Sequence, residues 1–152
     1  MANRGFAAIG LHRPKCDGNV GGAIRAAGCY DARLVVVGGP RGTMKGRVER
    51  TDPRSTHRTI PVLWLPSILE GVPHECAVVA VEIAKNARPL PGFAHPERAF
   101  YIFGPEDGSI PNDIVALCDH VVMIPTVGCM NLAATVNVVL YDRMAKQWRS
   151  ER

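Results

Sequence analysis

Residues 121–149, VVMIPTVGCMNLAATVNVVLYDRMAKQWR, hold the clearest structural pattern in the chain. The run 121–124 is short and apolar, as expected of a buried strand. A helical pattern over 131–149 follows. Its apolar face consists of Leu132, Val136, Val139 and Leu140, and its polar face of Asp142, Arg143, Lys146 and Arg149. Asn131 stands where an N-cap belongs. This stretch predicts a strand, a loop and a long amphipathic helix.

The same alternation of apolar runs and helical patterns extends through the rest of the chain. We expect further strands at 6–11, 34–37, 62–65, 77–83 and 100–103, and helices near 21–29, 67–71 and 112–118. The apolar runs are nearly continuous, as in strands buried on both faces. Strand–helix alternation predicts an α/β fold with a mostly parallel sheet. The length of 152 residues fits one domain over 1–152.

Composition excludes several classes of protein. Hydrophobic residues make up 47% and charged residues 21%, which excludes a wholly disordered chain. No run of 18 apolar residues occurs, so we expect no membrane span. The opening MANRGFAAIG lacks the apolar core of a signal peptide, which predicts a cytoplasmic protein. The five cysteines form no CxxC pair and the five histidines are scattered, so we expect reduced thiols and no metal site.

Positive charge is concentrated in one segment, residues 41–58, which we call the basic segment. It holds Arg41, Lys45, Arg47, Arg50, Arg54 and Arg58 against only Glu49 and Asp52, and so carries the whole net charge of +4. We expect a loop here, because the segment interrupts the apolar pattern. Such a loop is often simply solvated, but a flexible basic loop beside a site can also bind phosphates.

Common catalytic signatures are absent. The run Gly38-Gly39-Pro40-Arg41-Gly42 follows a strand, but no GK[ST] follows it, and neither GxGxxG nor GxSxG occurs. Adjacent carboxylates such as Glu106 and Asp107 point apart on a turn, which disfavours glycosidase chemistry.

Three other clusters carry unusual residues. In the first, NVGGAIR at 19–25, Asn19 can cap a helix and Arg25 is the one charged residue of a small-residue helix, where it could simply face solvent. The second, FGPEDG at 103–108, places Glu106 at the carboxyl end of a strand, where open α/β sheets bind ligands, although it could be a plain acidic turn. The third is the loop at 124–134.

Together, these clusters resemble the three motifs of the SPOUT superfamily of RNA methyltransferases, more narrowly its SpoU/TrmH branch and the minimal TrmL type. The pattern NxGxxxR matches Asn19, Gly21 and Arg25, and FGPE-x-G matches 103–108. MNL(S/A) and VVLYD match 130–133 and 138–142, so the resemblance covers almost the whole chain.

The resemblance implies a SPOUT-type α/β knot, in which the C-terminal segment forms a trefoil knot, a rare exception to unknotted folds. It also implies a homodimer whose sites borrow from the neighbouring subunit, and the Gly/Ala-rich helix 21–28 suits such an interface. The implied cofactor is S-adenosylmethionine, converted to S-adenosylhomocysteine. Its expected contacts are Glu82, Ile83, Gly104, Pro105, Glu106, Ile124, Cys129, Met130, Leu132 and Ala133.

The implied reaction transfers a methyl group to a ribose 2′-hydroxyl. Arg25 matches the family's catalytic arginine, and we interpret it as a phosphate clamp because a guanidinium is very hard to deprotonate. Asn19 and Asn131 would position the arginine and the ribose, while Glu106 holds Asn19 or the arginine. The basic segment falls where TrmL-like enzymes contact tRNA, so its six cations and Arg25 are the expected RNA contacts.

The implied substrate is tRNA, at the wobble nucleoside of the anticodon loop. Alternatives are ribosomal RNA or another tRNA position, a non-catalytic RNA-binding relative, and a small-molecule enzyme that would leave the basic segment unexplained. Two departures from the family pattern bear on activity. Cys129 replaces the usual Ser, a stronger hydrogen-bond donor, and the loop 125–130 is shorter than in typical relatives.

Overall fold

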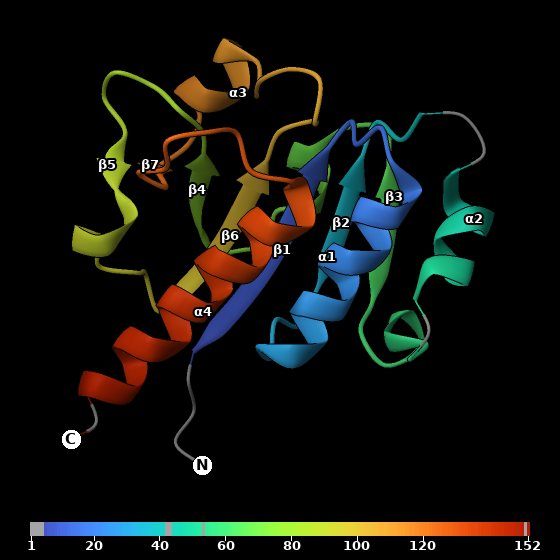
Figure 1. The fold of residues 1–152 in the computed structure, drawn as a ribbon, viewed down its shortest axis with the longest axis horizontal. Helices are drawn as coiled ribbons and strands as arrows, with labels where there is room; N and C mark the ends of the chain where they lie inside the picture. Colours follow the sequence, from blue (N-terminus) through green and yellow to red (C-terminus); the bar gives the residue numbers. More distant parts are fainter. Residues whose placement is uncertain (1–4, 42–43, 53, 151) are drawn as a thin grey trace.

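A computed structural model of the chain describes residues 5–41, 44–52, 54–150 and 152 (Figure 1). Within this part, one sheet has the strand order β3-β2-β1-β6-β4-β7-β5, and every pair of neighbours is parallel. The strands are β1 (Phe6–His12), β2 (Val35–Gly38), β3 (Val62–Leu65), β4 (Ala77–Val81), β5 (Arg88–Pro89), β6 (Arg98–Phe103) and β7 (His120–Met123). The predicted α/β fold with a mostly parallel sheet is confirmed, whereas the trefoil knot stays a prediction.

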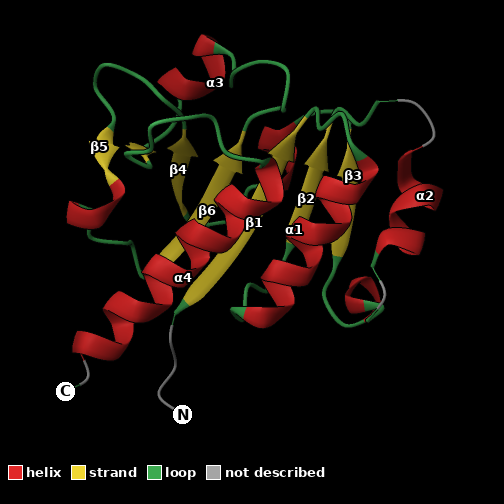
Figure 2. Ribbon diagram, in the orientation of Figure 1, coloured by secondary structure: helices red, strands yellow, loops and turns green. Residues whose placement is uncertain are grey.

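Helices cover the sheet as Figure 2 shows. They are α1 (Asp17–Cys29), α2 (Met44–Thr51), α3 (Asn112–Ala116) and α4 (Leu132–Ser150), with 3₁₀ turns η1 (Thr56–Arg58), η2 (Ile68–Gly71) and η3 (Leu90–Gly92). Helices α1 and α4 pack side by side on one face of the sheet. None of the helices in the described ranges is long and apolar enough to cross a membrane.

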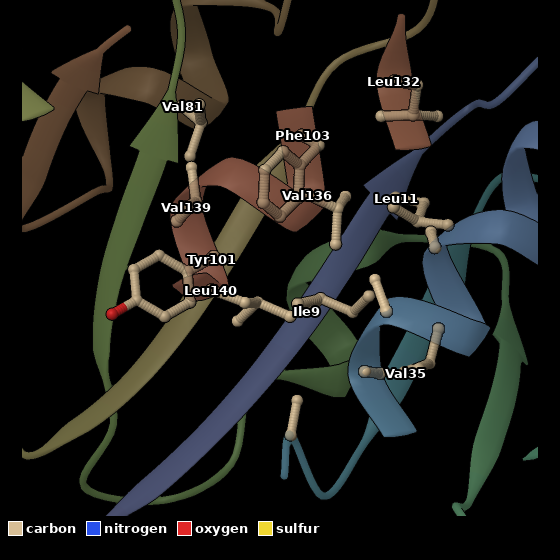
Figure 3. Close-up of a cluster of buried hydrophobic side chains, with 14 of the residues drawn as sticks. Ile9, Leu11, Val35, Val81, Tyr101, Phe103, Leu132, Val136, Val139 and Leu140 are labelled. Atoms are coloured by element: carbon tan, nitrogen blue, oxygen red, sulfur yellow. The ribbon is translucent and has the colours of Figure 1, made fainter. Parts of the chain in front are cut away.

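The strand side chains form two apolar layers, one on each face of the sheet, because successive side chains of a strand point to opposite faces. Toward α1 and α4 lie the side chains drawn in Figure 3, among them Ile9, Leu11, Tyr101, Phe103, Val136 and Leu140. Their strand neighbours Ala8, Phe100 and Ile102 pack on the other face with Ile68 and Ile110. Burial on both faces explains the nearly continuous apolar runs of the strands.

Two predictions about the N-terminal half are wrong. Residues 44–51 form helix α2 instead of a loop, because Met44 and Val48, one helical turn apart, are both 1% exposed and anchor it to the core. Helix α1 begins at Asp17, so Cys16 is its N-cap and Asn19 lies inside the helix, where its side chain is not a cap. Two smaller differences concern element type and length. The helix predicted near 67–71 is the 3₁₀ turn η2, which is capped by Ser67, and the strand predicted at 77–83 ends at Val81.

The glycines of α1 allow close packing within the chain. A Cβ at Gly21 would collide with the side chain of Thr51 in α2, and one at Gly22 would lie 2.9 Å from the Cβ of Ala133. At Gly28 it would lie 2.7 Å from Cγ2 of Thr56. Contacts of α1 with its own chain therefore account for these small residues without a second subunit.

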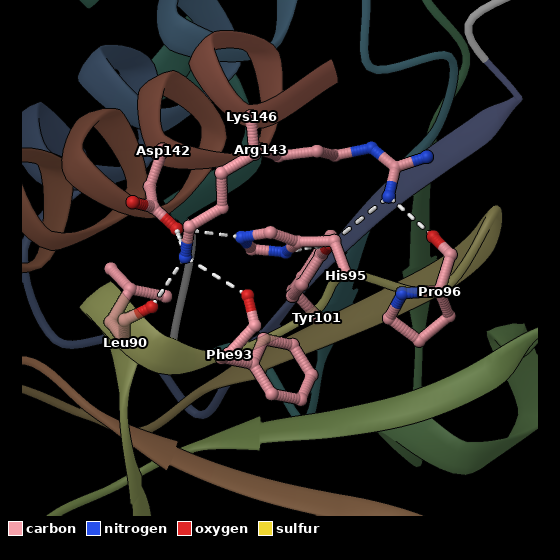
Figure 4. Close-up of polar contacts among 8 residues, drawn as sticks. All are labelled: Leu90, Phe93, His95, Pro96, Tyr101, Asp142, Arg143 and Lys146. Atoms are coloured by element: carbon pink, nitrogen blue, oxygen red, sulfur yellow. Dashed lines mark hydrogen bonds and ion pairs between the residues drawn. The ribbon is translucent and has the colours of Figure 1, made fainter. Parts of the chain in front are cut away.

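The predicted polar face of α4 is partly buried (Figure 4). Arg143 is 4% exposed and donates to the carbonyls of Pro96 (2.5 Å) and Glu97 (2.7 Å) and to the hydroxyl of Tyr101 (3.3 Å). Burial raises the pKa of Tyr101 to about 12. Polar residues can be buried on this face because strand β6 and the segment before it supply acceptors far away in sequence.

Two further residues of this face extend the network. Lys146 donates to the carbonyls of Leu90 (2.6 Å) and Phe93 (2.9 Å) and to Oδ2 of Asp142 (2.6 Å). Nε2 of His95 lies 2.8 Å from the same oxygen. Burial lowers the pKa of His95, although Asp142 acts in the opposite direction. This network fastens the C-terminal half of α4 to the segment 90–97.

Candidate functional site

A cavity of about 320 Å³ opens where strands β4, β6 and β7 end. Ligands of open α/β sheets bind beyond the carboxyl ends of the strands, and the volume suits a small molecule. The walls come from the loops after these strands and from the first turn of α4. Nine of the ten expected cofactor contacts line it, namely Glu82, Ile83, Gly104, Pro105, Glu106, Ile124, Cys129, Met130 and Leu132.

The tenth expected contact, Ala133, is not among the lining residues, because its side chain packs toward Gly22 of α1. The lining also includes polar residues that the sequence did not single out, Thr126, Ser109 and Thr135. Thr126 donates from Oγ1 to the carbonyl of Gly128 (2.8 Å), which folds the loop after β7 back on itself. The sequence shows that such hydroxyl residues stand in loops, but it does not show that these loops meet at a cavity.

Glu82 fastens two walls of the cavity together. Its Oε1 accepts from the amide of Ile83 (3.0 Å) and its Oε2 from the amide of Ile110 (2.8 Å). The carboxylate therefore joins the loop after β4 to the loop after β6. This arrangement makes Glu82 a residue that shapes the cavity through its neighbours.

Glu106 receives three hydrogen bonds from the start of α1. Its Oε2 accepts from the amide of Lys15 (2.8 Å), and its Oε1 accepts from the amide of Cys16 (3.2 Å) and from Nδ2 of Asn19 (2.9 Å). Burial would raise the pKa of Glu106, but these hydrogen bonds outweigh it and lower the pKa below its usual value. Glu106 is therefore a charged carboxylate at neutral pH.

Asn131 links this cluster to α4. Its Nδ2 donates to Oδ1 of Asn19 (2.6 Å), and its Oδ1 accepts from the amide of Ala134 (3.2 Å). The second bond is that of an N-cap, so the predicted cap of α4 is confirmed. The hydrogen bonds between Glu106 and Asn19 and between Asn19 and Asn131 thus join the three sequence clusters at one edge of the cavity.

Arg25 stays outside this network. It lies six residues after Asn19, which is about 9 Å along α1 and about 120° around it. Its side chain is exposed and has no hydrogen-bond or ion-pair partner in the described part of the chain. Gly22 faces α4 and Gly21 faces α2, so Arg25 points outward between these two helices.

Four of the six cations of the basic segment have side chains within the described residues. Arg41 makes two hydrogen bonds of 3.0 Å with Asp107, and Nε of Arg47 lies 3.6 Å from Oδ2 of Asp17. The Arg41 hydrogen bonds lower the pKa of Asp107 below its usual value. Arg54 and Arg58 are exposed near η1. The side chains of Lys45 and Arg50, also expected to contact RNA, lie outside the described residues.

No cluster of three or more His, Cys, Asp or Glu side chains in the described ranges could hold a metal ion. Cys129 lines the cavity, and the five cysteines are all unpaired. The site thus offers backbone groups, carboxylates, amides, hydroxyls and one thiol.

Solved structures share this fold. The SpoU methyltransferase AviRb from Streptomyces viridochromogenes superposes with a TM-score of 0.84 at 22% identity, covering 95% of this chain and 61% of AviRb. A second AviRb structure is in complex with AdoMet. The A. aeolicus TrmH/SpoU tRNA modifying enzyme gives a TM-score of 0.79 at 14% identity, covering 95% of this chain and 77% of that chain.

A further similar structure was solved for insight into the 2-OH methylation of C/U34 on tRNA. It gives a TM-score of 0.76 at 21% identity, with 95% of this chain and 92% of that chain covered. The chain spans about three fifths of the first structures that it matches. No curated protein matches the chain.

The family comparison covers most of the chain. The model of the SpoU rRNA Methylase family matches residues 7–141, a range that begins within β1, includes all three sequence clusters and ends within α4. On this match, the chain belongs to the SpoU rRNA Methylase family.

Proposed function

We propose that the protein is an S-adenosylmethionine-dependent RNA methyltransferase that acts on a ribose 2′-hydroxyl of tRNA in the cytoplasm. The observation that carries the proposal is the hydrogen-bonded chain Glu106–Asn19–Asn131, which brings the three motifs together beside the cavity. Membership of the SpoU family and the AdoMet complex of AviRb support the cofactor.

The residues around the cavity fit this cofactor. Ile124, Met130 and Leu132 offer an apolar wall of the kind that adenine prefers, and the loops beside them offer backbone donors and acceptors. Gly104 lets the loop after β6 fold closely on itself, since a Cβ there would lie 3.1 Å from the amide of Ile110 in the same loop. When bound, S-adenosylmethionine would supply the electrophilic methyl group.

The chain's own residues would align and activate the hydroxyl. Asn19 and Asn131, fixed by Glu106, are the amides available to orient the ribose, and alignment is the main requirement of an in-line displacement. Arg25 would bind the adjacent phosphate and stabilise the developing negative charge on oxygen. Its free, exposed guanidinium suits an RNA contact.

The position of Arg25 favours a homodimer. Because Arg25 lies away from the Asn19 cluster of its own chain, its guanidinium is available to the site of a neighbouring subunit. Exposed apolar side chains at Ile83 (68%) and Val127 (111%) flank the cavity and could be covered in such a dimer. The substrate we favour is the wobble nucleoside of tRNA, with ribosomal RNA or another tRNA position as the alternative.

Methyl-labelled S-adenosylmethionine, incubated with the protein and unmodified tRNA or ribosomal RNA, tests the proposal. Mass spectrometry of the digested RNA should find label in a 2′-O-methylated nucleoside of tRNA, and the Arg25→Ala variant should lose the label while keeping cofactor binding. Label on a base would contradict the proposed reaction. Cofactor and RNA binding without any label would instead indicate a non-catalytic RNA-binding protein.

A further inference from the structure

A buried carboxylate lies within the basic segment. Asp52 is 2% exposed, its Oδ2 accepts from the backbone amide of His57 (2.8 Å), and the same oxygen lies 2.7 Å from Nδ1 of the His57 ring. Burial raises the pKa of Asp52, but the hydrogen bonds from His57 and from the amide of Thr56 outweigh it and keep the pKa low. Asp52 is thus a buried carboxylate that is hydrogen-bonded to the backbone and the ring of His57.

This pair fixes the orientation of the His57 ring. Since Nδ1 faces Asp52, the opposite nitrogen, Nε2, points away from the carboxylate. When both ring nitrogens carry a proton, Nε2 is a hydrogen-bond donor that faces away from Asp52. The side chain of His57 keeps 19% of its surface exposed, and no described residue bonds to Nε2.

Two arginines lie on the same turn, Arg54 three residues before His57 and Arg58 directly after it. Arg54 and Arg58 are exposed, and their side chains have no hydrogen-bond or ion-pair partner among the residues that the structure describes. The turn is held by hydrogen bonds from the amide of Ser55 to the carbonyl of Asp52 (2.9 Å) and from the amide of Arg58 to the carbonyl of Ser55 (2.9 Å).

Ser55 itself has a φ of 52°, in the left-handed region. Residues other than glycine that are held in this conformation occur preferentially at ligand-binding positions. Backbone strain in Ser55 therefore accompanies the fixed ring of His57 on the same short turn.

The turn also lies beside Arg25. Gly28 is three residues after Arg25 in α1, so the two are neighbours on the helix surface. A Cβ at Gly28 would lie 2.7 Å from Cγ2 of Thr56, which places η1 against this point of the helix. Exposed Arg25 and the turn at 54–58 therefore share one side of the molecule.

We propose that His57, flanked by Arg54 and Arg58, binds a backbone phosphate of the RNA substrate near the phosphate bound by Arg25. In this site Nε2 of His57 donates to the phosphate, and buried Asp52 orients the ring through the hydrogen bond at Nδ1. The assignment rests on the proposed function, because it takes RNA as the substrate and Arg25 as one of its contacts. The alternative is that the Asp52–His57 pair only stabilises the turn.

Two substitutions of His57 separate these roles. The side-chain nitrogen of asparagine sits as many bonds from Cα as Nδ1, so His57→Asn can keep the bond to Asp52 while it removes the outward donor. The nitrogen of glutamine instead matches Nε2, so His57→Gln keeps an outward donor and loses the bond to Asp52. Arg88→Gln, which removes an exposed cation from the far edge strand β5, is the matched control.

The experiment measures the Kd for unmodified tRNA at about pH 6 over a range of salt concentrations, together with the thermal midpoint of each variant. For His57→Asn we expect an unchanged midpoint, a Kd about three- to tenfold weaker, and a plot of log K against log salt that is shallower by about 0.7–0.9. Arg88→Gln should match the wild type. A Kd and slope of wild-type size in His57→Asn would overturn the proposal, as would losses of affinity that merely follow losses of thermal stability in both His57 variants.

Labelled methyl transfer by the same preparations distinguishes this proposal from the proposed function. If the wild type methylates tRNA while His57→Asn binds it as well as the wild type, the phosphate site alone is overturned. If no RNA is labelled but His57→Asn still binds tRNA more weakly at unchanged stability, the proposed reaction fails and the phosphate site stands. A wild type that binds no RNA would overturn both.

Discussion

Replacing Glu106 by glutamine tests the network on which the candidate site depends. The carboxylate accepts on both oxygens, Oε2 from Lys15 and Oε1 from Cys16 and Asn19. Glutamine has one acceptor oxygen, and its NH₂ group would face a backbone amide that is also a donor. The best orientation keeps the two bonds on the Oε1 side, and it loses the bond to Lys15 and the negative charge.

The size of the effect follows from these losses. A hydrogen bond to a charged group is worth about 1.5–3 kcal/mol, and the solvent exposure of Glu106 reduces this to about 1–2 kcal/mol. For a chain of this length we expect the thermal midpoint to fall by about 2–8 °C. Weaker positioning of Asn19 and Asn131 should slow methyl transfer by about ten- to hundredfold, since small misplacements are costly in displacement reactions.

Thermal unfolding followed by circular dichroism, and single-turnover methyl transfer at saturating cofactor, measure the two effects. Asp113→Asn is the control, because it neutralises an exposed carboxylate in α3 and leaves the three motifs unchanged. A Glu106→Gln variant with the midpoint and transfer rate of the control would refute the reasoning. It would show that the bonds to α1 hold neither the fold nor the site.

Three further expectations concern stability. Arg143→Met removes a donor from the carbonyls of Pro96 and Glu97 and from the hydroxyl of Tyr101, although Glu97 still accepts from the amide of Phe6, so it should lower the free energy of unfolding by about 2–4 kcal/mol, as measured by urea titration. Gly21→Ala should lower the free energy of unfolding by about 1–3 kcal/mol, because its Cβ meets Thr51. Gly92→Ala should change it little, because nothing lies within 4 Å of a Cβ there. Equal losses of stability in the two variants would contradict the packing of α1. Because folding lowers the pKa of Asp52, its carboxylate stabilises the folded state at pH values above its unfolded pKa of about 3.9. This stabilisation is lost as the pH falls through the pKa that Asp52 has in the folded state. The stability gap between wild type and Asp52→Asn should therefore narrow in acid, and a gap that is constant from neutral pH to about pH 3 would contradict the hydrogen bonds that lower this pKa.

The layout of the sheet could be predicted because its central strands are buried on both faces. The run at 62–65 has the predicted bounds of β3, and Asn131 caps α4 as its position indicates. Helix α2 could not be recognised, since two apolar residues, Met44 and Val48, are too few to mark a helix in a charged sequence. Strand β5 is two residues long, too short to leave a pattern.

The site was accessible mainly through the family resemblance. Local pattern places Asn19 near a helix start and Glu106 after a strand, but it does not show that they meet. The bond between Asn19 and Asn131 joins residues 112 positions apart, and the Arg143 bonds span 42–47 positions. Such contacts depend on the order of strands in the sheet, which periodicity does not encode.

Helix α4 is fastened near both ends, by Asn131 at its start and by Arg143 and Lys146 near its end. The helix can therefore neither slide along its axis nor rotate without breaking several hydrogen bonds at once. The hydrogen bonds of the loop 124–130 are local, so we expect motion that admits or releases a ligand in this loop. Amide hydrogen exchange should therefore be slow along the middle of α4 and fast in this loop, so that the site opens by a hinge at one edge while its base stays rigid.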